Sequence, residues 1–342
     1  THITGLECDT SAALGIRLGL AGRFEEMCAL RFKALDWTDP EGVHDMRVAS
    51  RRLRCAFRDF MPYLRKQRLA GLLKEIKALA DTLGQVRDQD VAILALEKVS
   101  KKAPPEIAPG IQKFIDLRRE QREQARKELT QILSPETLGR LQANFTIALN
   151  AAIKSPRKPK KTMRPTNIAT YREVARSTIL ERLDELERLS ESLYHPLKVK
   201  PIHKMRIAAK NLRYALELFE QCWENSISSF PVQVARLQSS LGELHDCDVW
   251  IDNFGGMLST SEKRSEKRKR AAHNPQKLTE VWLLTYFVKL RTKHFRNSLD
   301  RWSEWERKHF TAKLRRKTRV PPSVESSPPP ATDEPPTAVL VE

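Results

Sequence analysis

The sequence is poor in glycine and in aromatic residues. Only 12 of its 342 residues are glycine, and aromatic residues make up 7%. Leu, Ala, Glu, Arg and Lys dominate instead, and these residues have high helix propensity. No apolar run approaches the ~18 residues that a membrane-spanning helix needs, and no segment has the pattern of a strand. Since 40% of the residues are hydrophobic, we expect an all-α protein with a packed core and no membrane insertion.

Cysteine is also sparse, and its spacing matches no metal-binding or redox motif. The number of cysteines is odd, and no two of them are spaced as CxxC. This usage is typical of buried thiols in a reducing compartment. It predicts a cytoplasmic protein in which the cysteines are thiols. The five residues are Cys8, Cys28, Cys55, Cys222 and Cys247.

Acidic residues are too few to balance the basic ones. The chain has 61 Lys and Arg against 43 Asp and Glu, a formal net charge of +18. The stretch 321–342 contains acids but no Lys or Arg, so the rest of the chain holds the whole excess. Such an excess implies a polyanionic partner, which could be nucleic acid, an anionic membrane surface or a phosphate polymer.

One stretch, residues 44–58, concentrates this charge in a regular pattern. Basic residues recur there every third or fourth position, which places them in one stripe on an α-helix. A neighbouring stripe is apolar and should face a core. No acid lies three or four residues from any arginine of the basic stripe, so the repulsion must be relieved by another helix, by salt or by a bound polyanion. The basic stripe is His44, Arg47, Arg51, Arg54 and Arg58.

The remaining pattern predicts helices almost throughout. Gly84 is a plausible helix stop, and Asp88 a plausible N-cap for the helix after it. A basic, proline-containing stretch at 154–165 predicts a linker, so we expect helical halves at 1–153 and 166–312. The segment 313–342 should be a basic and then Pro-rich, disordered tail. The expected helices are 11–36, 43–61, 65–83, 89–101, 107–133, 136–153, 167–194, 202–222, 231–243, 247–258 and 277–310.

Two blocks of sequence occur twice in the same order. Residues 44–58 match 203–217 at an offset of 159, and 83–91 match 241–249 at an offset of 158. Two matched blocks at nearly one offset indicate an internal duplication. We therefore predict two similar antiparallel helical bundles related by a pseudo-two-fold axis. Each half would contribute one basic helix to a shared central channel.

The repeated motifs HxxRxxxRxLR and HxxRxxxKxLRY, each followed by LGxxxDxDV, resemble the CHAD (conserved histidine α-helical domain) family. The resemblance extends over about residues 10–310. It implies an all-α fold, binding of inorganic polyphosphate in a basic channel, and association with polyphosphate granules. With two further arginines of the first basic helix, the candidate polyphosphate-binding residues are His44, Arg47, Arg51, Arg52, Arg54, Arg58, His203, Arg206, Lys210 and Arg213.

Two departures from strict repetition make the halves unequal. The first copy has Cys55 where the second has Tyr214. The second copy ends its stripe in Glu217, where the first has Arg58. An i,i+4 pair between Arg213 and Glu217 would partly neutralise the second stripe. We therefore expect the first stripe to dominate binding.

Two other functions remain open on the sequence. A nucleic-acid-binding protein could use the same basic surface with the basic tracts 154–164 and 263–270. A phosphohydrolase of the HD type could use His44 and Asp45, but the second copy replaces that acid with Lys204. No catalytic constellation, metal site or cofactor motif stands out, so we predict no enzyme activity, no metal and no cofactor.

Two further clusters have simpler explanations than a ligand site. The acids of each DxD motif, Asp88 with Asp90 and Asp246 with Asp248, point about 200° apart on a helix and cannot share one metal ion. Capping, or pairing with the stripe arginines, is the better interpretation. The C-terminal aromatic residues have helical spacing and should pack in a core instead of stacking on bases. They are Trp282, Tyr286, Phe287, Trp302, Trp305 and Phe310.

Overall fold

The protein is built from α-helices, as the composition predicts. A computed structural model describes residues 3, 5–39, 41–153, 169–224, 226–266 and 275–319, without the side chains of 261–266. Within this part no strand forms, and only two isolated bridges occur. The elements are α1 (Ala12–Ala29), α2 (Arg31–Leu35), α3 (Gly42–Phe60), η1 (Met61–Tyr63), α4 (Lys66–Ser100), α5 (Ala108–Ile132), α6 (Pro135–Ala152), α7 (Tyr171–Leu189), η2 (Ser190–Tyr194), α8 (Val199–Phe219), η3 (Glu220–Trp223), α9 (Ser229–Glu266), α10 (Pro275–Arg307) and α11 (Phe310–Lys317).

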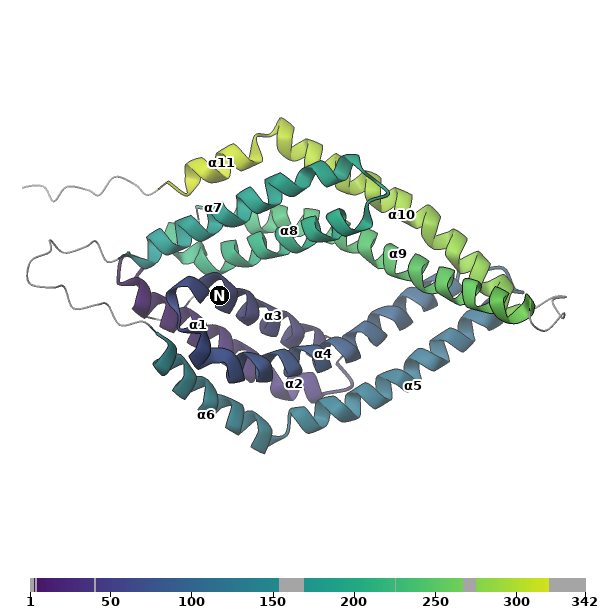
Figure 1. The fold of residues 1–342 in the computed structure, drawn as a ribbon, viewed down its shortest axis with the longest axis horizontal. Helices are drawn as coiled ribbons and strands as arrows, with labels where there is room; N and C mark the ends of the chain where they lie inside the picture. Colours follow the sequence, from purple (N-terminus) through teal and green to yellow (C-terminus); the bar gives the residue numbers. More distant parts are fainter. Residues whose placement is uncertain are drawn as a thin grey trace, which may run out of the picture.

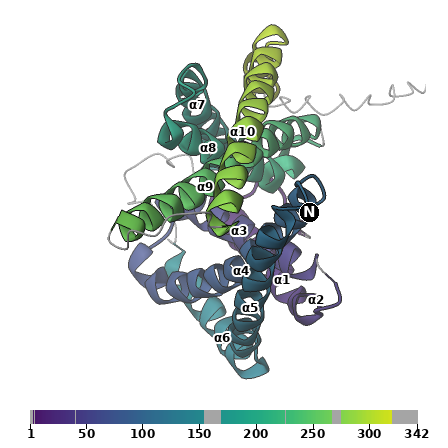
Figure 2. The ribbon, with the colours of Figure 1, turned by 90° about the vertical axis from the view of Figure 1, so that its right-hand side faces the viewer.

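Two long antiparallel helix pairs dominate the shape. Helices α4 and α5 run side by side in one part of the molecule, and α9 and α10 in the other (Figure 1). Figure 2 shows α9 and α10 crossing α4 and α5 where the two pairs meet. A small apolar cluster joins all four helices at that end, and a larger core spans the rest of both parts. The small cluster includes Ile93, Ile111, Phe254, Leu283 and Phe287.

Local sequence explains where several helices begin. The Ser11 and Ser134 side chains accept hydrogen bonds from the backbone N–H groups of Leu14 and Thr137, which caps α1 and α6. Thr170 and Glu173 form a reciprocal capping box at the start of α7. These caps use N–H groups that a helix cannot satisfy internally.

The two expected helix breaks after Leu83 and Glu243 do not occur. Helix α4 continues through Gly84 and Asp88, and α9 continues through the matched Asp246. Gly84 therefore does not stop a helix, and neither aspartate is an N-cap. Leu83, Val86 and later apolar residues keep α4 packed across the glycine, and such packing outweighs a propensity difference of about 1 kcal/mol. The basic residues after 312 were expected in the tail, but up to Lys317 they belong to α11.

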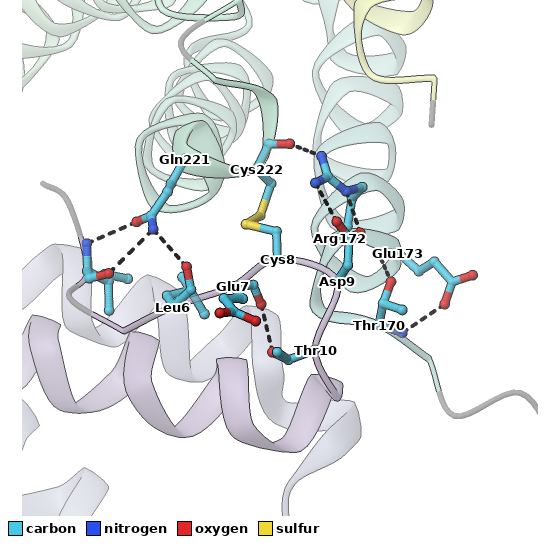
Figure 3. Close-up of a disulfide and its surroundings, with 11 residues drawn as sticks. Leu6, Glu7, Cys8, Asp9, Thr10, Thr170, Arg172, Glu173, Gln221 and Cys222 are labelled. Atoms are coloured by element: carbon cyan, nitrogen blue, oxygen red, sulfur yellow. Dashed lines mark hydrogen bonds and ion pairs between the residues drawn. A yellow bond between two sulfur atoms is a disulfide. The ribbon is translucent and has the colours of Figure 1, made fainter. Parts of the chain in front are cut away.

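The cysteine prediction was wrong for two of the five residues. Cys8 and Cys222 form a disulfide that joins the N-terminal segment to η3 (Figure 3). Around it, the Gln221 side chain bonds the backbone of Ile3 and Leu6. The pairing could not be read from the sequence, because the chain brings these residues together over 214 positions. Cys55 and Cys247 are buried thiols as expected, and Cys28 is a half-buried thiol.

An ion pair supports the same junction. The Arg172 guanidinium of α7 makes two hydrogen bonds to the Asp9 carboxylate, at 2.7 and 2.8 Å, and also donates to the Cys222 carbonyl (Figure 3). The backbone N–H of Arg172 donates to the Cys8 carbonyl at 2.8 Å. The N-terminal segment is thus fixed to α7 and η3, which both follow the predicted linker.

Three predicted features lie wholly or partly outside the described residues: the linker 154–165, the second half (267–270) of the basic tract 263–270 and the Pro-rich tail from 321. Among the helices that the structure describes, none is long and apolar enough to cross a membrane.

Candidate functional site

Helices α3 and α8 carry the two matched basic stripes on half-buried faces. The predicted apolar stripe of α3 is buried, with Met46, Leu53 and Phe60 fully inaccessible. On α8, Met205 and Leu212 are equally inaccessible. Burial of these faces fixes the rotation of each helix and leaves the stripe residues at the boundary between protein and solvent. Along the stripes all side chains are half-buried except Arg54, which is exposed.

The fold brings three of the predicted cations together from the two stripes. Burial lowers the pKa of Arg51, and nearby Arg47 and Arg213 lower it further. Burial likewise lowers the pKa of Arg206; the nearby Asp246 opposes this shift, and Arg51 adds to it. Burial also lowers the pKa of Lys210 to about 8, with contributions from Arg51 and Arg206. We refer to Arg51, Arg206 and Lys210 as the cation cluster.

Among the described residues, no carboxylate forms an ion pair with the cation cluster, although Asp246 lies near enough to affect the pKa of Arg206. Within the described residues, no carboxylate lies within ion-pair distance of Arg51, Arg206 or Lys210. The Nε of Arg51 is buried and has no hydrogen-bond partner. Half-buried cations that repel one another and lack acids raise the free energy of the empty site, and an anionic ligand would lower it.

Arg47 and Arg206 lie over matched glycines on the following long helices. A Cβ added to Gly84 of α4 would lie 3.7 Å from the Arg47 Nε, and one added to Gly242 of α9 would lie 3.9 Å from the Arg206 Nε. Arg47 Nη2 also donates to Asp88 Oδ1 at 3.0 Å, one helical turn after Gly84. The glycine of each LGxxxD segment therefore leaves space for the arginine. In the first half, the aspartate of the segment also binds that arginine.

The residues that make these contacts lie within a segment that matches a known family. The family model described as the CHAD domain matches residues 19–254. The chain belongs to the CHAD domain family. This range includes both stripes and both glycine segments. No curated protein matches the chain.

Solved structures show the same fold at low sequence identity. The CHAD domain from the plant Ricinus communis is 19% identical, with a TM-score of 0.60 over 85% of this chain and 90% of that chain. PptA from Streptomyces chartreusis is 13% identical, with a TM-score of 0.61 over 86% of this chain and 100% of that chain. The likeness of this CHAD protein to both concerns the fold.

Several candidate residues of the CHAD domain are already paired with acids. Arg52 binds Glu26 of α1 at 3.1 Å and Glu217 of α8 at 3.0 Å, so it ties helices together outside the cation cluster. Glu217 also binds Arg213 at 3.0 Å, the i,i+4 pair expected from the sequence. Arg58 binds the buried Asp59 at 2.8 Å.

Each stripe histidine has a basic or imidazole neighbour on the long helix that follows. Burial and the nearby Arg87 lower the pKa of His44. His203 Nδ1 lies 3.2 Å from His245 Nδ1, so one ring must donate and the other accept. Burial, Arg206 and His203 lower the pKa of His245 to about 4. Sequence reasoning did not select Arg87 and His245, although both stand three residues after the glycine of the repeated block.

The acids of the two DxD motifs point to different partners. Asp88 binds Arg47, as the pairing interpretation predicted, whereas Asp90 lies 3.5 Å from Arg122 of α5. Asp248 accepts a hydrogen bond from Arg291 of α10 at 2.5 Å. In the described part of the chain, no group of three or more metal-ligating side chains gathers.

Asp246 is the exception among these acids, because it has no ion pair within the described residues. Partial removal from water raises the pKa of Asp246. The positive charge of Arg206 lowers this pKa, and the negative charge of Asp88 raises it. The side chain nevertheless keeps contact with solvent. Asp88 of α4 and Asp246 of α9 are thus close enough for their negative charges to repel. Each lies near the arginine that packs over the glycine of its own helix.

The C-terminal aromatic residues pack as predicted. Trp302, Trp305 and Phe310 are buried in the main core, and Phe287 is buried in the small cluster. Trp282 and Tyr286 are half-buried against that same cluster. None of them lies on the basic stripes.

Proposed function

We propose that this CHAD protein binds inorganic polyphosphate through the cation cluster and the stripe residues around it, and that it does not catalyse turnover. The observation that carries the proposal is the meeting of Arg51, Arg206 and Lys210 without a carboxylate partner. Polyphosphate offers a closely spaced row of anionic oxygens, which suits a row of arginine and lysine donors. The two stripes would line a central channel.

The energetics of Lys210 support a polyanion as the ligand. Its pKa is lowered from 10.5 to about 8, which corresponds to roughly 3 kcal/mol of unfavourable environment for the charged amine. A phosphate chain beside it would reverse the contribution that comes from neighbouring cations. Counterion release would add to the affinity, so binding should weaken steeply with salt.

The proposal of a non-catalytic role rests on three of the four acids of the DxD motifs; Asp246, which has no ion pair within the described residues, is the exception. Asp88, Asp90 and Asp248 are each engaged with an arginine. A carboxylate held in this way is stabilised in its charged form and is a weak general base. We propose that the protein binds or organises polyphosphate chains and leaves them intact.

We further propose that the protein works in the cytoplasm at polyphosphate granules. The three free thiols support a cytoplasmic location, and polyphosphate as the proposed ligand supports association with the granules. The Cys8–Cys222 bridge would be unusual in a reducing compartment, so the redox state of this pair in cells is a direct check on the location.

A competition experiment distinguishes polyphosphate from nucleic acid. Labelled polyphosphate is bound at fixed salt and challenged with an excess of duplex DNA or of RNA. We expect neither competitor to displace polyphosphate on equal terms per phosphate, and for duplex DNA the reason is that a narrow channel would exclude a duplex. Displacement by DNA on equal terms would favour a general nucleic-acid-binding surface. Release of phosphate after addition of divalent metal would instead support a hydrolase.

A further inference from the structure

A cavity with basic residues in its lining lies away from the stripes, where α9 begins and α10 turns into α11. It has a volume of about 660 Å³, within the range of small-ligand sites. The helices meet at this elbow because His309 adopts a left-handed conformation with φ 51°, which turns the chain between α10 and α11. The cavity is lined by residues of all three helices, including Phe230, Arg236, Arg301, Trp305 and Lys313.

The cavity carries an excess of positive charge. Four basic residues line it, Arg236, Arg301, Lys308 and Lys313, against the single acid Glu304. Glu304 is already engaged with Lys308 at 2.6 Å. Among the described residues, no carboxylate lies within ion-pair distance of the exposed side chains of Arg236 and Lys313. An anion entering the cavity would therefore meet cations that are free to bind it.

One cation is held in a fixed orientation. The Arg301 Nε donates a hydrogen bond of 2.7 Å to Ser240 Oγ, and Ser240 is 3% exposed. The guanidinium is half-buried, and the described residues offer it no carboxylate at ion-pair distance. A preoriented guanidinium can bind a phosphate group through its remaining N–H donors.

The other part of the cavity wall is apolar. The rings of Trp305 and Phe310 stack with their centroids 3.8 Å apart, and Phe230 packs edge-on against Phe310 at 5.3 Å. Leu237 also belongs to this wall. Phe230, Leu237, Trp305 and Phe310 are at most 7% exposed, so Val232, which is 55% exposed, adds most of the accessible apolar surface of these five side chains. An inorganic phosphate chain would gain nothing from these surfaces, whereas an apolar ring joined to phosphate groups would use both parts of the cavity.

We propose that this cavity binds a nucleotide, with its phosphates at Arg236, Arg301 and Lys313 and its base against the apolar wall. The site is separate from the cation cluster and does not depend on polyphosphate binding there. Its ligand differs in class, since the apolar wall selects an organic phosphate over an inorganic one.

Calorimetry on the full chain tests the proposal with ATP, adenosine and inorganic triphosphate as probes. In the Arg51→Glu variant, whose cation cluster should no longer hold inorganic phosphate chains, we expect ATP to bind at least tenfold more tightly than inorganic triphosphate. Arg236→Glu and Lys313→Glu, both on exposed side chains, should weaken ATP at least tenfold and leave polyphosphate affinity within about twofold. The matched variant Arg51→Glu should leave ATP binding to the cavity unchanged. ATP affinity that survives both cavity variants, or that equals the affinity for inorganic triphosphate, would overturn the proposal. Because ATP and inorganic triphosphate are compared in the Arg51→Glu variant, this test does not depend on whether polyphosphate binds at the stripes.

Discussion

Arg47 of α3 passes directly over Gly84 of α4, at a distance of 3.7 Å from the position where a Cβ would stand. The same relationship links Arg206 to Gly242. We expect Gly84→Leu to weaken polyphosphate binding several-fold, because a branched side chain would occupy the place of the arginine. Gly84→Ala should keep affinity within about twofold and stabilise the fold by ~0.5–1 kcal/mol, because mid-helix glycine is unfavourable and a Cβ fits.

Binding isotherms and thermal unfolding of both variants check this expectation. Gly139→Leu is the matched control, since Gly139 of α6 is exposed and has open space around it. Equal polyphosphate affinity for Gly84→Leu and Gly139→Leu would show that the position of Arg47 is unimportant for binding.

Polyphosphate affinity should fall as pH rises above about 8. Lys210 of the free protein loses its proton there, whereas a bound polyanion would raise its pKa and retain the proton. Lys210→Arg, which stays charged, should show a flatter pH profile. Calorimetry in two buffers of different ionisation enthalpy should detect proton uptake on binding near pH 8.5. No proton uptake, or the same profile for Lys210→Arg, would remove Lys210 from the site.

The stability of the free protein should increase as pH rises above about 8, whereas polyphosphate affinity should decrease. Because the pKa of Lys210 is lower in the folded state, the unfolded chain binds more protons between about pH 8 and pH 10.5. The contribution of Lys210 to stability therefore increases with pH across this window. Chemical denaturation of the wild type and of Lys210→Met at pH 7.5 and pH 9.5 measures that difference. A contribution that decreases over the same interval would contradict the depressed pKa.

The histidines should make binding tighter in mildly acidic solution. Burial and nearby cations lower the pKa of His203 in the free protein. A polyanion would raise that pKa, so affinity should increase as pH falls through and below the ordinary range near 6.5. His203→Gln should reduce this increase. An affinity independent of pH between 5.5 and 7.5 would exclude a role for protonated histidine.

Removal of the disulfide should destabilise the whole fold. Cys8 and Cys222 close a loop of 214 residues, and bridges of this kind contribute about 2–4 kcal/mol. Cys222→Ser should lower the Tm, whereas Cys28→Ser, a change at a half-buried thiol, should lower it less. Thiol titration of the denatured, unreduced protein should give three thiols. A count of five would mean that the bridge is absent.

The basic stripe was predictable because it depends on helix periodicity alone. The spacing of Arg47, Arg51 and Arg54 and the burial of Leu53 beside them both follow from 3.6 residues per turn. The i,i+4 pair of Arg213 with Glu217 was predictable for the same reason. Local rules succeed when the interacting residues lie within one or two turns of a single helix.

Contacts between distant segments were not predictable in this way. Arg52 shares the sequence character of the stripe arginines, yet acids from α1 and α8 engage it. Gly84 has the local signature of a helix end, but its function depends on Arg47, which lies 37 positions earlier. The neighbour of each stripe histidine likewise comes from another helix. Only the repeated blocks contained a signal for these positions.

The central claim is that the cation cluster binds polyphosphate, and charge reversal with a matched control tests it most directly. Arg51→Glu and Arg140→Glu change the net charge equally, but Arg140 is exposed on α6 and makes no described ion pair. We predict that Arg51→Glu weakens polyphosphate binding at least tenfold at fixed salt with helicity intact. Arg140→Glu should weaken it less than threefold. Equal losses for the two variants would contradict the account, because binding would then follow net charge alone.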